Sequence, residues 1–285
     1  MCFTVLCYVL GNDCAIAISE HVAGSVEGFA EKMNQKAQEL NLTHTHFVTP
    51  HGLDDENHYT TAYELALLTD YALKNEKFKN IVSTKTTTIS VNSTPRTISN
   101  TNELLGNFEG VYGVKTGFTF NAGRCLVSSC NRNGMDIIVV VLGADTKNQR
   151  TRDSMNVIHY VYDTFEYVNL SDYIQESFAE YKTYYEQNVW LQKTITKPNI
   201  ALSEMNNTIF PLKANTLNSL ETKFYTLNSL SSSVPSHEKI GNITIFYEGK
   251  ILCSTDIILT NQLEQNSWQY YFGKILKELK NSFVY

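Results

Sequence analysis

Three strand-like runs, with a long helical pattern directly after them, constrain the fold more than any other feature of this sequence. The runs cover residues 111–116, 124–130 and 135–142, and Asn133-Gly134 supplies a tight turn between the last two. The helical pattern covers about residues 149–165. This succession predicts three neighbouring strands, the last two joined by a tight turn, followed by a long helix.

The segment before these strands is mainly helical. Asn12 or Asp13 is expected to cap a helix that runs to about residue 23, and Ser25 starts a second helix that runs to about residue 40. Thr61-Ala-Tyr-Glu64 is a capping box, which predicts a further helix start. Residues 1–10 are apolar, and we interpret them as the tail of a buried helix; no export signal is visible.

The pattern changes after Tyr167. Short runs separated by turn residues extend from residue 189 to residue 259, which predicts a small β-rich domain at about 185–260. Residues 266–285 return to an amphipathic helical pattern, with aromatic and aliphatic residues on one face and lysines on the other. This helix either lies on a membrane surface or packs against the β-rich domain.

Composition excludes several classes of protein. The net charge is −6 and no basic stripe is present, so we expect no nucleic-acid partner. No apolar run approaches the roughly 20 residues that cross a bilayer. The six cysteines show no C-x-x-C spacing, which favours small buried thiols over a zinc site, a redox site or a disulfide framework.

Several sequence blocks stand in a definite order. They are Gly11-Asn12-Asp13-Cys14-Ala15, the Thr45–Asp54 loop, Gly113-Val-Lys115-Thr116-Gly117 with its extension to Gly123, and Gln149-Arg150. In this order they closely resemble the S-x-N block, the loop after it, the K-T-G strand and an arginine of the low-molecular-mass penicillin-binding proteins. These are the serine D-alanyl-D-alanine carboxypeptidases of peptidase family S11. The resemblance covers nearly the whole chain and is strongest over residues 11–165.

The resemblance implies a fold and an activity. The implied fold belongs to the α+β class: residues 1–166 would form part of a penicillin-binding/β-lactamase-like transpeptidase domain, and residues 185–260 a small C-terminal β-sandwich. The family removes the terminal D-alanine of peptidoglycan stem peptides through an acyl-enzyme, which a Ser–Lys pair forms. It acts outside the cytoplasm, at the cell wall or the outer face of the cytoplasmic membrane. Its implied partners are stem peptides that end in D-Ala-D-Ala and, in full-length members, β-lactams.

The resemblance also assigns roles to individual residues. Asn12 and Lys115 are the expected catalytic residues, and Thr116, Gly117, Phe118 and Arg150 are the expected substrate-binding residues. Lys115, Thr116 and Arg150 would contact the terminal carboxylate of the substrate. Gly117 would let its backbone approach, and the N–H of Phe118 would form half of an oxyanion hole. Asn12 would hold the peptide carbonyl, and no cofactor or metal is implied.

The sequence departs from the family pattern at the nucleophile. The family's S-x-x-K motif lies upstream of the other blocks, and the serine of the S-x-N block is replaced by Leu10. Ser236-His-Glu-Lys239 has the S-x-x-K spacing, but it follows the K-T-G strand, and Pro235 places it in a turn rather than at a helix start. We therefore expect these 285 residues to contain no nucleophile and to be catalytically inactive.

Two other functions fit parts of the sequence. A non-catalytic cell-wall protein would use the same residues to bind D-Ala-D-Ala ends without cleaving them. A metal-dependent peptidase would use a cluster of His44, His46, His51, His58, Asp54 and Asp55. That cluster lacks the H-E-x-x-H pairing of helical zinc sites, and the matching family loop is structural, so we expect its side chains to form local hydrogen bonds.

Overall fold

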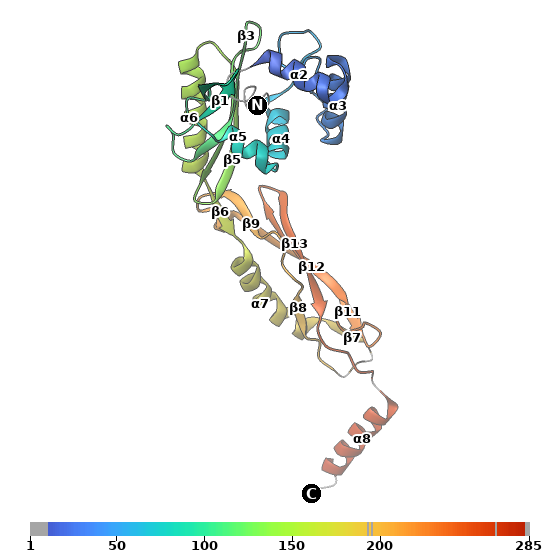
Figure 1. Cartoon of the computed structure of the whole chain (residues 1–285). Coiled ribbons are helices and arrows are strands. Elements are labelled where there is room, and N and C mark those ends of the chain that lie inside the picture. The colour runs from blue at the N-terminus through green and yellow to red at the C-terminus, as the bar shows by residue number, and fades with distance from the viewer. Residues whose placement is uncertain (1–10, 193, 195, 266, 283–285) are drawn as a thin grey trace. The chain divides into compact units, whose positions relative to one another are not determined.

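The computed structural model describes residues 11–192, 194, 196–265 and 267–282, and it divides into two compact units (Figure 1). The first unit is Met1–Thr164 and the second is Phe165–Tyr285. The helix tail expected at residues 1–10, with Leu10, lies outside the described residues.

The first unit is built on an antiparallel sheet. Its strands are β3 (Val111–Thr119), β4 (Gly123–Arg132) and β5 (Met135–Ala144), in the order β3-β4-β5. Asn133 and Gly134 form the two-residue turn between β4 and β5, with φ of 51° and 84°. Positive φ at both positions suits a hairpin turn, and Asn-Gly is the dipeptide that adopts it most easily. The predicted strands and turn are confirmed.

Helices cover both faces of this sheet (Figure 1). Helix α6 (Lys147–Thr164) packs on β4 and β5, where Ile158 joins the fully buried Leu126. On the other side, α4 (Ala62–Leu73) contacts β5 and α5 (Glu76–Val82) contacts β3. Val82 is buried there against Val114. The sheet is therefore held between two apolar layers, which fixes the position of β3.

Two more helices and a hairpin complete the first unit: α2 (Asn12–Ala23), α3 (Val26–Glu39), β1 (Thr86–Val91) and β2 (Thr94–Ser99). Ser25 caps α3, and its side chain accepts a hydrogen bond from Gly28 N at 3.0 Å. The cap expected at Asn12 or Asp13 is wrong, because the N-cap of α2 is Gly11. Asp13 lies in the first turn instead, where its charge complements the helix dipole.

The capping box of α4 forms only in part. Thr61 Oγ1 accepts a hydrogen bond from Glu64 N at 3.2 Å, as predicted. The carboxylate of Glu64 turns to the 43–45 segment, where it accepts hydrogen bonds from the backbone N–H of His44 at 2.8 Å and from the hydroxyl of Thr45. Glu64 therefore fastens the start of α4 to a segment some twenty residues earlier.

Thr61→Ala is expected to destabilise the first unit by about 1 kcal/mol, because the Glu64 N–H loses its capping oxygen. Thr61→Ser keeps that oxygen and should cost only a few tenths of that amount. Urea unfolding followed by the far-ultraviolet circular dichroism of both variants measures the difference. Equal losses in the two variants would show that the cap does not contribute.

The second unit combines strands with a long helix, α7 (Ser171–Asn188), which the sequence reading does not predict. One sheet has the order β10-β12-β13-β8, and β6 with β9 and β7 with β11 form two further pairs of strands. The bounds are β6 (Phe165–Asn169), β7 (Trp190–Gln192), β8 (Ile200–Leu202), β9 (Ile209–Lys213), η1 (Thr216–Ser219), β10 (Glu221–Thr226), β11 (Ser229–Ser231), β12 (Lys239–Tyr247) and β13 (Lys250–Leu259).

The core of the second unit is formed by α7 together with the strands. Ile174 and Phe178 of α7 are buried in the same cluster as Ile243 of β12 and Ile257 of β13. A helix therefore shares the core of this unit with the strands. The α+β class predicted for the chain is unaffected, since both units combine helices with antiparallel strands.

The last helix is α8 (Trp268–Ser282), which lies where an amphipathic helix was predicted. Its apolar residues are about half exposed or more: Trp268, Tyr271, Phe272, Ile275, Leu276 and Leu279. Within the described residues, no helix is both long enough and apolar enough to cross a membrane.

Candidate functional site

Strand β3 carries the block Lys115-Thr116-Gly117-Phe118 next to β4, in the register Lys115↔Val127 to Phe118↔Arg124. Lys115 is half-buried, and its Nζ donates a hydrogen bond to Thr116 O at 2.8 Å. Thr116 is 5% exposed, and its Oγ1 is hydrogen-bonded to Thr101 Oγ1 at 2.5 Å. When Thr101 is the donor, the Thr116 hydroxyl keeps its own proton for a ligand, because a hydroxyl donates once and accepts twice.

Gly117 is not required by the fold itself. A Cβ built on this residue would meet Cys125 Cβ at 3.7 Å, an ordinary van der Waals distance. By contrast, a Cβ on the neighbouring Gly113 would lie 2.8 Å from Ser129 Oγ. Packing within the protein therefore explains the glycine at position 113. It does not explain the glycine at position 117, which is consistent with close approach of another molecule to the strand at that point.

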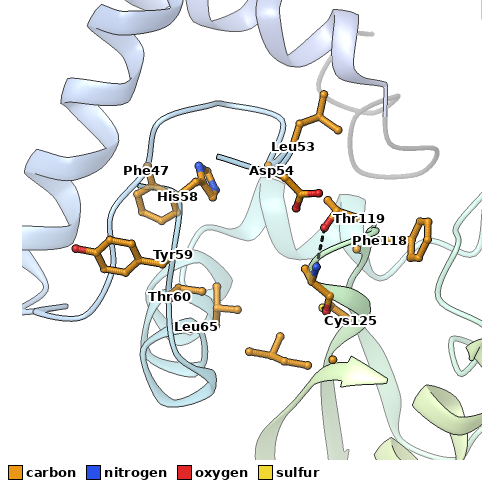
Figure 2. Close-up of a pocket in the computed structure, with 15 residues that line it drawn as sticks. Phe47, Leu53, Asp54, His58, Tyr59, Thr60, Leu65, Phe118, Thr119 and Cys125 are labelled. Atoms are coloured by element: carbon orange, nitrogen blue, oxygen red, sulfur yellow. Dashed lines mark hydrogen bonds between the residues drawn. The ribbon is translucent and has the colours of Figure 1, made fainter. Parts of the chain in front are cut away.

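A cavity of about 510 Å³ lies between the 47–60 segment and the hairpin formed by β3 and β4 (Figure 2). One wall comes from Phe47, Gly52, Leu53, Asp54, His58, Tyr59, Thr60 and Leu65, and the other from Gly117, Phe118, Thr119, Ala122, Cys125, Leu142 and Gly143. Figure 2 shows Asp54 and Thr119 on facing sides of it. The lining is mainly apolar with a few polar groups, which is typical of a small-molecule or peptide site.

Neighbouring helices anchor the first residues of the 43–60 segment. Asn34 of α3 pairs with the backbone of Phe47 through two hydrogen bonds of 2.8 Å, one to its O and one from its N. Glu64 of α4 binds His44 and Thr45, as described above. Burial opposes ionisation of Glu64, but the hydrogen bonds from Thr45 and His44 outweigh it and lower its pKa. The carboxylate therefore stays charged and keeps its donors at neutral pH.

The histidines of this segment are used for local hydrogen bonds. His46 Nδ1 lies 2.6 Å from Asn57 O, and His58 Nδ1 accepts hydrogen bonds from Val48 N and Thr49 N at 3.1 and 3.3 Å. Asp55 Oδ1 accepts from Asn57 N at 2.8 Å. In the part of the chain that the structure describes, no three His, Cys, Asp or Glu side chains lie close enough together to hold a metal. The local hydrogen bonds expected for this loop are confirmed.

Phe118 and Arg124 form an exposed stack at the end of the hairpin. The guanidinium carbon of Arg124 lies 3.7 Å from the centroid of the Phe118 ring, within the range of a cation–π contact. Phe120 packs edge-on against Phe118 at 5.6 Å and is itself 94% exposed. The Phe118 side chain is thus held by its neighbours, and its backbone position on β3 is fixed beside the cavity.

Arg150 is held within the protein. It lies near the start of α6, is 3% exposed, and its Nη2 forms an ion pair with Glu103 Oε2. Its Nε is buried without a hydrogen-bond partner among the described residues. Because an uncompensated guanidinium is costly to bury, the pair with Glu103 is what allows Arg150 to occupy this position.

Comparison with known proteins decides the family. The sequence profile described as D-alanyl-D-alanine carboxypeptidase, peptidase family S11, matches residues 4–146, about half of the chain. This chain belongs to the S11 family. The resemblance found in the sequence blocks is thereby confirmed, and the K-T-G strand of this S11 chain lies inside the matched range.

Relatives of this S11 chain match nearly all of it. DacF of Bacillus subtilis, a D-alanyl-D-alanine carboxypeptidase, is 28% identical over 256 residues, which cover 90% of this chain and 64% of DacF. DacC of Escherichia coli, also a D-alanyl-D-alanine carboxypeptidase, is 31% identical over 268 residues, which cover 93% of this chain and 63% of DacC. Penicillin binding protein 5 of Haemophilus influenzae superposes with a TM-score of 0.66 at 25% identity, covering 93% of this chain and 74% of that structure.

These comparisons confirm the predicted α+β fold of a penicillin-binding protein. They also fix how much of the relatives is represented here, since the chain spans just under two thirds of the length of DacF and DacC.

The structure brings two of the six predicted site residues of this S11 chain to the cavity. Gly117 and Phe118 line it. Lys115 and Thr116 lie directly before them on β3, and Asn12 is the first residue of α2, half-buried. Among the described residues that line the cavity, Asn12, Lys115, Thr116 and Arg150 do not appear. Their roles toward a substrate stay predictions.

The sequence reading missed the opposite wall of the cavity. Asp54 and His58 line it, although the sequence predicts only local hydrogen bonds for the side chains of their loop. Cys125, predicted as a small buried thiol, lines the wall formed by β3 and β4. The available signal was the resemblance of the 45–54 block itself. Only the tertiary contact between this loop and the β3–β4 hairpin shows that the block lies across from the K-T-G strand.

Proposed function

We propose that the Lys115–Phe118 strand binds the terminal D-alanine carboxylate of a peptidoglycan stem peptide, as part of a D-alanyl-D-alanine carboxypeptidase. The observation that carries this proposal is the cavity beside Gly117, where the fold leaves a Cβ-sized space at an S11 K-T-G strand. The family match and the names of the relatives support the same activity.

The residues on the strand have complementary parts in this proposal. The Lys115 ammonium attracts the carboxylate, and the Thr116 hydroxyl donates a hydrogen bond to it once Thr101 acts as the donor to Thr116. Gly117 lets the peptide backbone lie against the strand, and the Phe118 N–H donates a hydrogen bond in the oxyanion hole. Asn12 would orient the peptide carbonyl. Arg150 contributes to the site through its ion pair with Glu103, and its guanidinium is not a free pair of donors for the carboxylate.

The chemical step needs a group that these 285 residues do not supply by themselves. In the proposed reaction a serine oxygen attacks the D-Ala-D-Ala carbonyl, the terminal D-alanine leaves with a proton, and water then hydrolyses the ester. Each residue named above binds or orients. We therefore propose that this chain alone binds D-Ala-D-Ala ends without turning them over, and that the activity belongs to a polypeptide that also holds the Ser–Lys pair.

The proposal includes a place of action. Peptidoglycan stem peptides lie outside the cytoplasm, so the protein would act at the cell wall. The exposed apolar face of α8 supports peripheral contact with the outer surface of the membrane, because aromatic side chains such as Trp268 and Phe272 partition into the headgroup region.

Thr116→Val tests the carboxylate contact. The isosteric change removes the hydroxyl, and a hydrogen bond to a charged group is worth about 1.5–3 kcal/mol, so binding of an N-acetylated Lys-D-Ala-D-Ala peptide should weaken by about tenfold or more. Isothermal titration calorimetry of the purified chain measures this change. Binding of the peptide with unchanged affinity by Thr116→Val would contradict the proposal.

A matched control is available in the same unit. Thr88 of β1 is hydrogen-bonded to Thr97 Oγ1 at 3.3 Å and lies outside the cavity. Thr88→Val makes the same chemical change there, and it should leave peptide affinity as in the original chain.

A further inference from the structure

The protonation state of His58 is set by the loop that it holds. Its Nδ1 accepts hydrogen bonds from Val48 N at 3.1 Å and from Thr49 N at 3.3 Å. A backbone N–H can only donate, so Nδ1 must present its lone pair, and the proton of the neutral ring must be on Nε2. Protonation of Nδ1 would break both hydrogen bonds, because the new N–H would then face the N–H groups of Val48 and Thr49.

His46 on the same segment has the opposite arrangement. Its Nδ1 lies 2.6 Å from the carbonyl oxygen of Asn57. A carbonyl only accepts, so His46 Nδ1 already carries a proton, and a second proton on Nε2 leaves this hydrogen bond in place. The two histidines therefore respond differently to acid, although they lie twelve positions apart on one loop.

Few other hydrogen bonds between described residues hold the 48–54 segment. Thr49 Oγ1 accepts from Gly52 N, and His51 Nδ1 accepts from Leu53 N, both at 3.2 Å and both within the segment. Among the described residues, the hydrogen bonds that tie 48–54 to the rest of the unit are the two to His58. Gly52, Leu53 and Asp54 of this segment line the cavity.

We propose that the neutral imidazole of His58 is a positioning element for the cavity wall 48–54, and that protonation of His58 releases this wall. Phe47 stays in place on release, because Asn34 holds its backbone. The inference rests on the proposed function only in taking the cavity as the substrate site. The order of the loop itself is measured without substrate.

The surroundings of His58 set the direction of its response. Burial has the largest effect and lowers the pKa of His58; His46 and His51 lower it further, and Asp55 opposes them. Asp54, on the same wall of the cavity as His58, is the other charged side chain that lines it. The neutral form thus predominates at pH 7. The contribution of His58 to loop order is complete above the ordinary histidine pKa of about 6.5 and is lost as the pH falls through the lowered value.

Nuclear magnetic resonance of the full chain tests the proposal without any substitution. The ring ¹⁵N shifts at pH 7.5 should show an unprotonated Nδ1 in His58 and a protonated Nδ1 in His46. On acidification, the amide signals of Val48 and Thr49 should move with the same midpoint as the His58 ring. Amide shifts that follow His46 or His51 instead, or that remain constant to pH 5, would overturn the proposal.

Hydrogen exchange with matched variants gives the second measurement. Between pH 7.5 and 5, the protection factors of the Val48 and Thr49 amides should fall. The expected decrease is about tenfold for each unit by which the pKa of His58 is lower with the loop ordered than with the loop released. His58→Asn keeps an acceptor oxygen near the Nδ1 position and cannot titrate, so its protection should stay constant. His46→Asn, which supplies a donor to Asn57 O, should keep the original decrease. A decrease that persists in His58→Asn would rule out the proposal, while the Thr116→Val test of peptide binding remains independent of it.

Discussion

Incubated with a fluorescent penicillin, the purified 285-residue chain is expected to remain unlabelled on a denaturing gel. Covalent labelling requires a serine oxygen to attack the lactam carbonyl and form an ester. Within these residues, S-x-x-K spacing occurs only at Ser236-His-Glu-Lys239. Ser236 lies in a turn before β12, in the second unit, and Lys239 Nζ forms an ion pair with Asp256 Oδ1 at 2.6 Å.

Loss of a covalent nucleophile lowers such reactions by at least about a thousandfold. A chimera that adds the S-x-x-K segment of a family relative ahead of this chain is the positive control, and it should be labelled within minutes. Labelling of the 285-residue chain itself would contradict the prediction of inactivity. Should that label disappear in Ser236→Ala, the turn serine would be the nucleophile.

Glu103→Ala is expected to destabilise the first unit by about 3 kcal/mol. Arg150 is 3% exposed, and its Nη2 pairs with Glu103 Oε2, while its Nε already lacks a hydrogen-bond partner within the described part of the chain. Removing one member of a buried pair leaves an uncompensated charge, which typically costs about 3–5 kcal/mol. The lower end applies here because the Glu103 side chain is 44% exposed, and water would reach part of the vacated space.

The positions of the tryptophans make this effect separable. Trp190 and Trp268 are the two tryptophans of the chain, and both belong to the second unit. Their fluorescence in urea should therefore be unchanged by Glu103→Ala, whereas the exchange of the Leu126 and Ile158 amides should accelerate. Asp70→Ala, which breaks the exposed Lys74–Asp70 pair, should cost less than about 1 kcal/mol. Equal effects of Asp70→Ala and Glu103→Ala would show that Glu103 does not hold Arg150.

Local patterns predicted much of the first unit. The runs at 111–116, 124–130 and 135–142 appear as β3, β4 and β5, each somewhat longer than its pattern. Their signal was strong because alternation, β-branched residues and an Asn-Gly turn agree over a short stretch of chain. The capping box at Thr61 was found for the same reason, since the cap acts across three residues.

Helix α7 was missed although its signal is present. Ile174, Phe178 and Tyr185 lie on one buried face, at spacings that fit a helix. The many tyrosines and charged residues around them obscured the helical periodicity of this apolar face. Tyr181 and Tyr184, for example, add aromatic side chains at neighbouring positions. The helix becomes evident only when the sheet of β12 and β13 supplies the surface against which it packs.

The sequence alone determined the order of the blocks, the family and the strand that carries Lys115, Thr116 and Gly117, because these depend on residues close together in the chain. Tertiary structure alone decided what faces that strand. It placed Asp54 and His58 across the cavity from Gly117, and it turned Arg150 to Glu103, 47 residues away. Such pairings depend on how separate layers of the fold pack against each other. The residue pattern within one helix or strand does not specify which other element will cover it.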